Sequence, residues 1–180
     1  MCSNAMLLVI LSIFIIKTAN SLNCSDSTST LVDWPGTLLS VPADSLTKLP
    51  KCAGDLTRVI SNHAGPILFV PGTGAKSAIA QFSRGRTLEL NKLDWPHCFV
   101  DPPDYGFGDI QISGEYIAFS IRTMYECANR HRVNTIGHSQ DGMTPRWALR
   151  FWPDIRSLVN NMIDLVPVYH GIETITASYP

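Results

Sequence analysis

Residues 67–70 read Ile-Leu-Phe-Val, and Pro71 and Gly72 end this run at once. The run is too short for a helix and carries no polar residue, so we expect a β-strand that is buried on both faces. Strands of this kind occur in mostly parallel sheets with helices on either side. This one segment therefore predicts an α/β fold.

The rest of the chain continues the alternation of strands and helices. Residues 97–100 and 133–136 are further short strand candidates, and residues 75–93 form a weaker helical stretch. A stronger helix is expected after Ser113, which is a favoured residue type at a helix N-cap. Its apolar face would comprise Tyr116, Ile117, Ser120, Ile121, Met124 and Ala128.

The N-terminus carries an apolar segment of its own. Residues 6–16 are apolar apart from Ser12, and Lys17 and small residues follow them. A run of this length is too short to span a bilayer, so we predict a signal peptide over residues 1–21 and a secreted protein. The alternative is a buried or anchoring helix. A polar, proline-punctuated leader would then cover residues 22–50, and the globular part residues 51–180.

Charge and composition exclude several classes of protein. The chain has 14 Lys and Arg residues against 15 Asp and Glu, so no positive net charge would attract nucleic acid. The histidines His63, His97 and His131 and the cysteines show none of the spacings of a zinc site. We therefore expect no nucleic-acid partner, no metal and no cofactor.

Secretion also affects how the cysteines are interpreted. Cleavage of the signal peptide would leave Cys24, Cys52, Cys98 and Cys127 in an oxidising compartment, where disulfides persist. Four cysteines allow three pairings, and spacing alone does not choose among them. For Cys127, which lies in a predicted helix, a buried free thiol is the alternative.

The third predicted strand runs directly into Gly-His-Ser-Gln-Asp-Gly at residues 137–142. A serine on a sharp turn between a parallel strand and a helix exposes its hydroxyl, and the helix N-terminus offers N–H groups to a developing oxyanion. Ser139 is therefore a candidate nucleophile, with Gly137 allowing helix and strand to approach closely. Asp141 stands where a second glycine is usual and adds bulk and charge. The alternative is an ordinary strand-to-helix turn.

A second special loop follows the first strand, at Pro71-Gly72-Thr73-Gly74. Because carboxyl ends of parallel strands share one edge of the sheet, this loop and Ser139 are expected to face the same ligand site. A phosphate-binding loop is the alternative, since Lys76 and Ser77 follow shortly. However, Val70 and Ala75 occupy positions where that motif requires glycine.

The chain resembles secreted triacylglycerol lipases of the α/β-hydrolase fold, of the Candida antarctica lipase B type. The similarity extends over roughly residues 51–171. The stretches that carry it are 66–74, 98–103, 137–140, 146–149 and 151–157. The resemblance implies a central, mostly parallel sheet flanked by helices, from which the C-terminal strands are missing.

The resemblance also implies an activity and roles for single residues. Ser139 would be the nucleophile, and Thr73 and Gln140 would supply the oxyanion hole. The same family pairs cysteines at the positions of Cys52 and Cys98. The implied function is hydrolysis of acylglycerols or other lipid esters through an acyl-enzyme. A monomer that contacts a lipid surface is expected.

A serine hydrolase of this fold needs an acid and then a histidine after the nucleophile. Only His170 follows Ser139, and Asp164 precedes it too closely for the two to come from separate strand ends. The side chain of His138 is expected to point away from the serine hydroxyl. We therefore expect the acid and the histidine beyond Pro180 and predict no usable triad within this chain. The alternative is a non-catalytic secreted binding protein with a lipase-like fold.

Overall fold

A computed structural model describes residues 20–21, 36–58, 64–82 and 86–170. Their strands form one sheet in the order β1-β2-β4-β3-β5-β6. The pairs β3/β4, β3/β5 and β5/β6 are parallel, whereas β2 pairs antiparallel with β1 and with β4. The strands are β1 (Asn20–Ser21), β2 (Lys51–Ala53), β3 (Ile67–Val70), β4 (His97–Phe99), β5 (Val133–His138) and β6 (Val159–Leu165).

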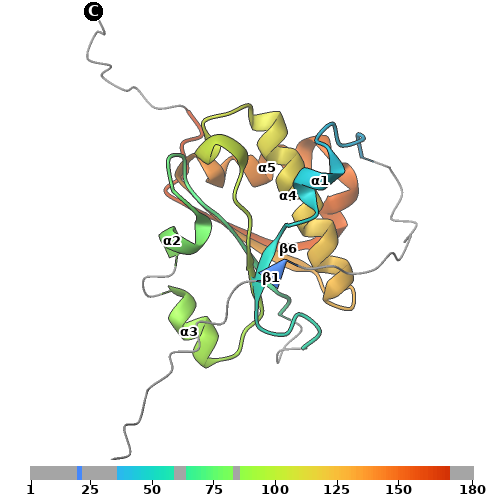
Figure 1. Cartoon of the computed structure of the whole chain (residues 1–180), viewed down its shortest axis with the longest axis vertical. Helices are drawn as coiled ribbons and strands as arrows, with labels where there is room; N and C mark the ends of the chain where they lie inside the picture. The colour runs from blue at the N-terminus through green and yellow to red at the C-terminus, as the bar shows by residue number, and fades with distance from the viewer. Residues whose placement is uncertain (1–19, 22–35, 59–63, 83–85, 171–180) are drawn as a thin grey trace, which may run out of the picture.

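Helices cover both faces of this sheet (Figure 1). The short helices α2 and α3 lie on one side, and α4 and α5 lie on the other. The α-helices are α1 (Ala43–Leu46), α2 (Ala78–Phe82), α3 (Arg86–Lys92), α4 (Ile110–Cys127) and α5 (Thr144–Phe151). Three 3₁₀ segments complete the described part: η2 (Pro103–Gly106), η3 (Ser139–Gly142) and η4 (Pro153–Leu158).

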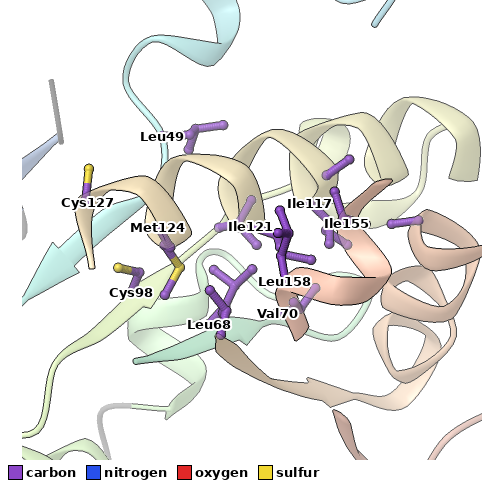
Figure 2. Close-up of a cluster of buried hydrophobic side chains, with 14 of the residues drawn as sticks. Leu49, Leu68, Val70, Cys98, Ile117, Ile121, Met124, Cys127, Ile155 and Leu158 are labelled. Atoms are coloured by element: carbon purple, nitrogen blue, oxygen red, sulfur yellow. The ribbon is translucent and has the colours of Figure 1, made fainter. Parts of the chain in front are cut away.

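The strand β3 is buried on both faces, as its sequence predicts. Leu68 and Val70 pack into the larger hydrophobic cluster, toward which Ile117 and Ile121 of α4 point (Figure 2). Phe69 belongs to a second cluster on the opposite face, together with Ala78, Phe82 and Phe99. Alternate residues of one strand thus fill two separate cores, which requires helices on either side.

The start of α4 differs from the prediction. The cap is Asp109, whose Oδ1 accepts a hydrogen bond of 2.7 Å from the N–H of Gln111. Ser113 lies inside the helix and is buried. Both residue types favour N-caps, and the helix begins at the earlier one because Ser113 is needed on its buried side.

The described residues of the helical stretch expected over 75–93 include the helices α2 and α3. Both helices fall inside the predicted stretch, whose start differs from the prediction. The first begins only at Ala78, because the carboxylate of Asp101 accepts its N–H at 2.6 Å. Ser77 then accepts the N–H of Ala80 at 3.0 Å and acts as a cap.

Residues 36–50 of the predicted leader are attached to the outside of α4. The buried carboxylate of Glu115 accepts the N–H and the hydroxyl of Ser40 and the N–H of Val41, at 2.6–2.7 Å. The indole of Trp152 donates to the carbonyl of Thr37 at 2.8 Å. Specific hydrogen bonds therefore hold Thr37, Ser40 and Val41 of the predicted leader against the globular part.

The cysteines agree with the family pairing. A disulfide joins Cys52 and Cys98, which face each other across β2 and β4. Cys127 is disulfide-bonded as well, so the alternative of a buried free thiol is wrong. No helix among the described residues is long and apolar enough to cross a membrane. The predicted signal peptide lies outside the described residues, except for Asn20 and Ser21 in β1.

Candidate active site

Ser139 lies at the turn between β5 and the segment that leads into α5. His138 is still extended, with φ −128° and ψ 137°, whereas Ser139 has a φ of 57° in the left-handed region. A non-glycine residue held there carries strain of roughly 1–3 kcal/mol, which is typical of functional turns. The backbone therefore turns sharply at Ser139.

Gly137 makes this sharp turn possible. A Cβ at this position would lie 2.2 Å from the carbonyl oxygen of Asp141 and 2.8 Å from the Cα of Gly142. Both are backbone atoms of the segment after the turn, so neither can move aside cheaply. The geometry matches the steric reason for expecting glycine at this position.

The loop after β3 lies directly beside the serine. A Cβ on Gly72 would be 3.2 Å from the Cβ of Ser139, so these backbones are nearly in contact. The hydroxyl of Thr73 donates a hydrogen bond to the side-chain oxygen of Gln140. The structure thus brings together Ser139, Thr73 and Gln140, whose roles in an oxyanion hole stay a prediction.

Two further residues hold this loop, and the sequence analysis did not single out either. Gln81 of α2 accepts the N–H of Gly72 at 2.7 Å and also bonds the Nδ1 of His138 at 2.8 Å. The carbonyl of Tyr105 accepts the N–H of Gly74 at 2.8 Å. Both contacts depend on tertiary structure, and no local motif marks them. The Nδ1 of His138 therefore bonds the amide of Gln81.

Asp141, which stands where a second glycine is usual after the nucleophile turn, is buried with only 1% of its surface exposed. One carboxylate oxygen accepts the hydroxyl of Thr144 at 2.6 Å, whereas Oδ2 has no hydrogen-bond partner. Burial raises the pKa of Asp141 to about 6, and the bond from Thr144 opposes this shift only in part. Room for Oδ2 exists because a glycine faces it: a Cβ on Gly106 would lie 3.3 Å away.

The acids that follow Ser139 have other partners. Asp154 forms a bidentate ion pair with Arg122, at 2.7 and 3.0 Å. Asp164 accepts a bond of 3.0 Å from Arg146 and another from the hydroxyl of Tyr169. In the part of the chain that the structure describes, neither acid bonds a histidine, and the hydroxyl of Ser139 has no histidine partner. No cluster suited to a metal ion occurs there either.

A hollow of about 290 Å³ adjoins the Gly72 loop. It combines apolar surface with the exposed Lys76. Its lining residues are Pro71, Ala75, Lys76, Asp101, Pro102, Asp104 and Tyr105. Neither Ser139 nor Thr73 lines this hollow, which lies next to the loop that carries Thr73.

Comparisons with known proteins show what the chain resembles. No family model matches the chain. It is 32% identical over 111 residues to lipase B of Pseudozyma antarctica, covering 62% of this chain and 32% of that protein. The crystal structure of Aspergillus fumigatus lipase B matches with a TM-score of 0.68 and 24% identity, over 88% of this chain and 38% of that one.

The chain thus spans about a third of the length of the relatives it matches. The structural match and the mostly parallel, helix-flanked sheet confirm the predicted α/β-hydrolase fold. The resemblance to lipases of the lipase B type, expected from the motifs, is confirmed as well.

Proposed function

We propose that this chain carries the nucleophile and the oxyanion hole of a secreted, lipase-like ester hydrolase, with Ser139 as the nucleophile. The observation that supports this most is the left-handed turn at Ser139 against the loop of Thr73. Such a turn holds the hydroxyl away from the sheet, where a substrate carbonyl can reach it. The relatives named lipase B support ester hydrolysis as the reaction class.

In the proposed reaction the Oγ of Ser139 attacks the carbonyl carbon of an ester. A C–O bond forms, and the carbonyl electron pair moves onto its oxygen, where the N–H groups of Thr73 and Gln140 stabilise the charge. Collapse of this intermediate releases the alcohol and leaves an acyl-enzyme. Water then adds to the acyl group and releases the acid, regenerating Ser139.

The hydroxyl proton of Ser139 needs a base, which then protonates the leaving alcohol. His138 is engaged with Gln81, and His170 is exposed beyond the end of β6. We propose that the histidine and the acid that orients it come from sequence outside the described residues. Ser139, Thr73 and Gln140 would then form one half of the catalytic machinery.

Two exposed aromatic residues beside the site support a lipid substrate. Tyr105 is 60% and Phe107 73% exposed, and the ring of Phe107 lies against Gly74 of the Thr73 loop. Large apolar side chains this exposed next to a candidate site favour an acyl chain or a lipid surface. The disulfide Cys52–Cys98 favours a secreted protein. A monomer is proposed.

The proposal is tested by measuring hydrolysis of p-nitrophenyl butyrate by a full-length protein that includes the sequence supplying the histidine and the acid. Ser139→Ala should reduce kcat/KM by at least about a thousandfold, since the nucleophile is lost. Ser45→Ala, on the exposed helix α1, is the matched control and should leave the rate unchanged. Equal rates for wild type and Ser139→Ala would overturn the proposal.

A non-catalytic binding protein is the second candidate. It is favoured by Asp141, whose buried, partly unpaired carboxylate follows the nucleophile position by two residues. A negative charge there opposes an oxyanion at the same turn. This candidate predicts that a non-hydrolysable ether analogue of a diacylglycerol binds wild type and Ser139→Ala equally, while neither hydrolyses the ester.

A further inference from the structure

A single side chain links the two loops of the candidate site. The Oε1 of Gln81 accepts the N–H of Gly72 at 2.7 Å, and its Nε2 lies 2.8 Å from the Nδ1 of His138. Gly72 immediately precedes Thr73, and His138 immediately precedes Ser139. The bridge therefore ends one residue from the proposed nucleophile and one residue from a proposed oxyanion donor.

The chemistry of the bridge determines where the proton of His138 lies. A backbone N–H can only donate, so the oxygen of the Gln81 amide must face Gly72. The amide nitrogen, which is purely a donor, then faces His138. Its partner Nδ1 must accept and is unprotonated, which leaves the ring neutral with its proton on Nε2.

The surroundings leave this bridge little freedom. A Cβ on Gly72 would lie 2.9 Å from the Nδ1 of His138, so the ring and the loop are already in close contact. Two further hydrogen bonds hold the same loop. The hydroxyl of Thr73 donates to the side-chain oxygen of Gln140, and the N–H of Gly74 donates to the carbonyl of Tyr105. Gln81 adds a direct tie to the end of β5, where the nucleophile turn begins.

We infer that Gln81 is a positioning residue, which ties the oxyanion loop to the nucleophile turn and holds His138 as its Nε2–H tautomer. The inference rests on the proposed function for its catalytic meaning, while the bridge itself can be measured without turnover. Its effect is to fix the distance between the N–H of Thr73 and the hydroxyl of Ser139. A displacement of either loop would reduce stabilisation of the oxyanion.

The first test uses Gln81→Glu, which has nearly the same shape but two acceptor oxygens. It can still accept the N–H of Gly72, but it requires a proton on the Nδ1 of His138. Nitrogen-15 NMR of the full-length protein should show an unprotonated Nδ1 in wild type and a protonated Nδ1 in the variant. Gln111→Glu, on the exposed start of α4, is the control and should leave the His138 signals unchanged.

The second test measures the tie to the loop. Gln81→Ala should speed hydrogen exchange at the Gly72 amide by about tenfold or more, because its acceptor is lost. It should also lower kcat for p-nitrophenyl butyrate with KM nearly unchanged, since the tie acts on the transition state. If Gln81→Ala fails to fold, His138→Asn, which keeps an acceptor near the Nδ1 position, can be compared with His138→Leu. His138→Leu alone should speed exchange at Gly72.

A protonated Nδ1 in wild type, or a tautomer unaffected by Gln81→Glu, would overturn the bridge. Gly72 exchange unchanged in both Gln81→Ala and His138→Leu would do so as well. These outcomes are independent of hydrolysis. If the tautomer changes as expected while Ser139→Ala leaves the ester rate intact, the bridge is upheld and the proposed function fails. If Ser139→Ala abolishes hydrolysis but Gln81→Ala has the kcat of wild type, the proposed function is upheld and Gln81 has no positioning role.

Discussion

Val70 and Gly137 lie opposite each other in the parallel register of β3 and β5. The two strands therefore leave the sheet at the same level, and the loop of Thr73 emerges beside the turn of Ser139. Neither loop would form the candidate site alone. Their juxtaposition follows from the strand register, which is set by two buried faces of β3.

Gly137→Ala should destabilise the fold by about 3 kcal/mol. The added methyl group would meet the carbonyl oxygen of Asp141 at 2.2 Å, and this is a backbone atom. Urea unfolding monitored by tryptophan fluorescence measures the effect. Gly108→Ala is the matched control, because its Cβ would be 3.4 Å from the nearest atom, in the side chain of Asp104. Similar losses in both variants would contradict the steric role of Gly137.

Glu115→Ala should release the segment at Ser40 and Val41 from α4. The change removes the acceptor of three hydrogen bonds and leaves partly buried N–H groups unpaired, which costs about 3 kcal/mol. Hydrogen exchange at the amides of Ser40 and Val41 should accelerate together with the loss of stability. Glu89→Ala removes an exposed carboxylate paired with Lys92 and should cost less than about 1 kcal/mol. Unchanged exchange at Ser40 would show that the carboxylate does not hold this segment.

Replacing Cys52 and Cys98 together by alanine should lower stability by up to about 4 kcal/mol, from the entropy of a chain closed over 46 residues. The fold should persist, because β2 and β4 remain paired by backbone hydrogen bonds. Thermal unfolding under non-reducing conditions measures the difference. An equal Tm for oxidised wild type and variant would contradict the prediction.

Much of the fold could be predicted because its signals are local. The four apolar residues of β3 indicated a strand buried on both faces, and β5 was recognisable as the short segment that runs into Gly137 and Ser139. The start of α4 was not predictable in this way. Asp109 and Ser113 are both good caps, and only packing, which buries Ser113, decides between them.

The candidate site shows the same division. The serine turn and the loop of Thr73 were recognisable from their glycines, because Gly137 meets the backbone of Asp141 and Gly142 and Gly74 has a positive φ. Gln81 and Tyr105 were not, since they reach the loop from other elements through single hydrogen bonds. The bulk that Asp141 adds at this turn is accommodated by Gly106, which is distant in sequence.

Asp141→Asn should change how stability depends on pH. Burial raises the pKa of Asp141 from 3.8 to about 6 in the folded protein. Well below pH 3.8 the carboxyl is protonated in both states, so its full contribution to stability is present. Between about pH 4 and pH 6 the unfolded chain loses its proton first, and stability falls. Above pH 6 the penalty levels off at roughly 3 kcal/mol.

Asparagine cannot ionise, so the variant should escape this penalty. It should be more stable than wild type at pH 8, by up to roughly 3 kcal/mol, and show no advantage at pH 3.5. Urea midpoints across this range give the comparison. Asp44→Asn, on the exposed helix α1, controls for a change of net charge and should follow the wild-type curve. A constant difference between Asp141→Asn and wild type at all pH values would mean that the buried carboxyl does not titrate in this window, because only a group whose pKa differs between the two states can change the slope.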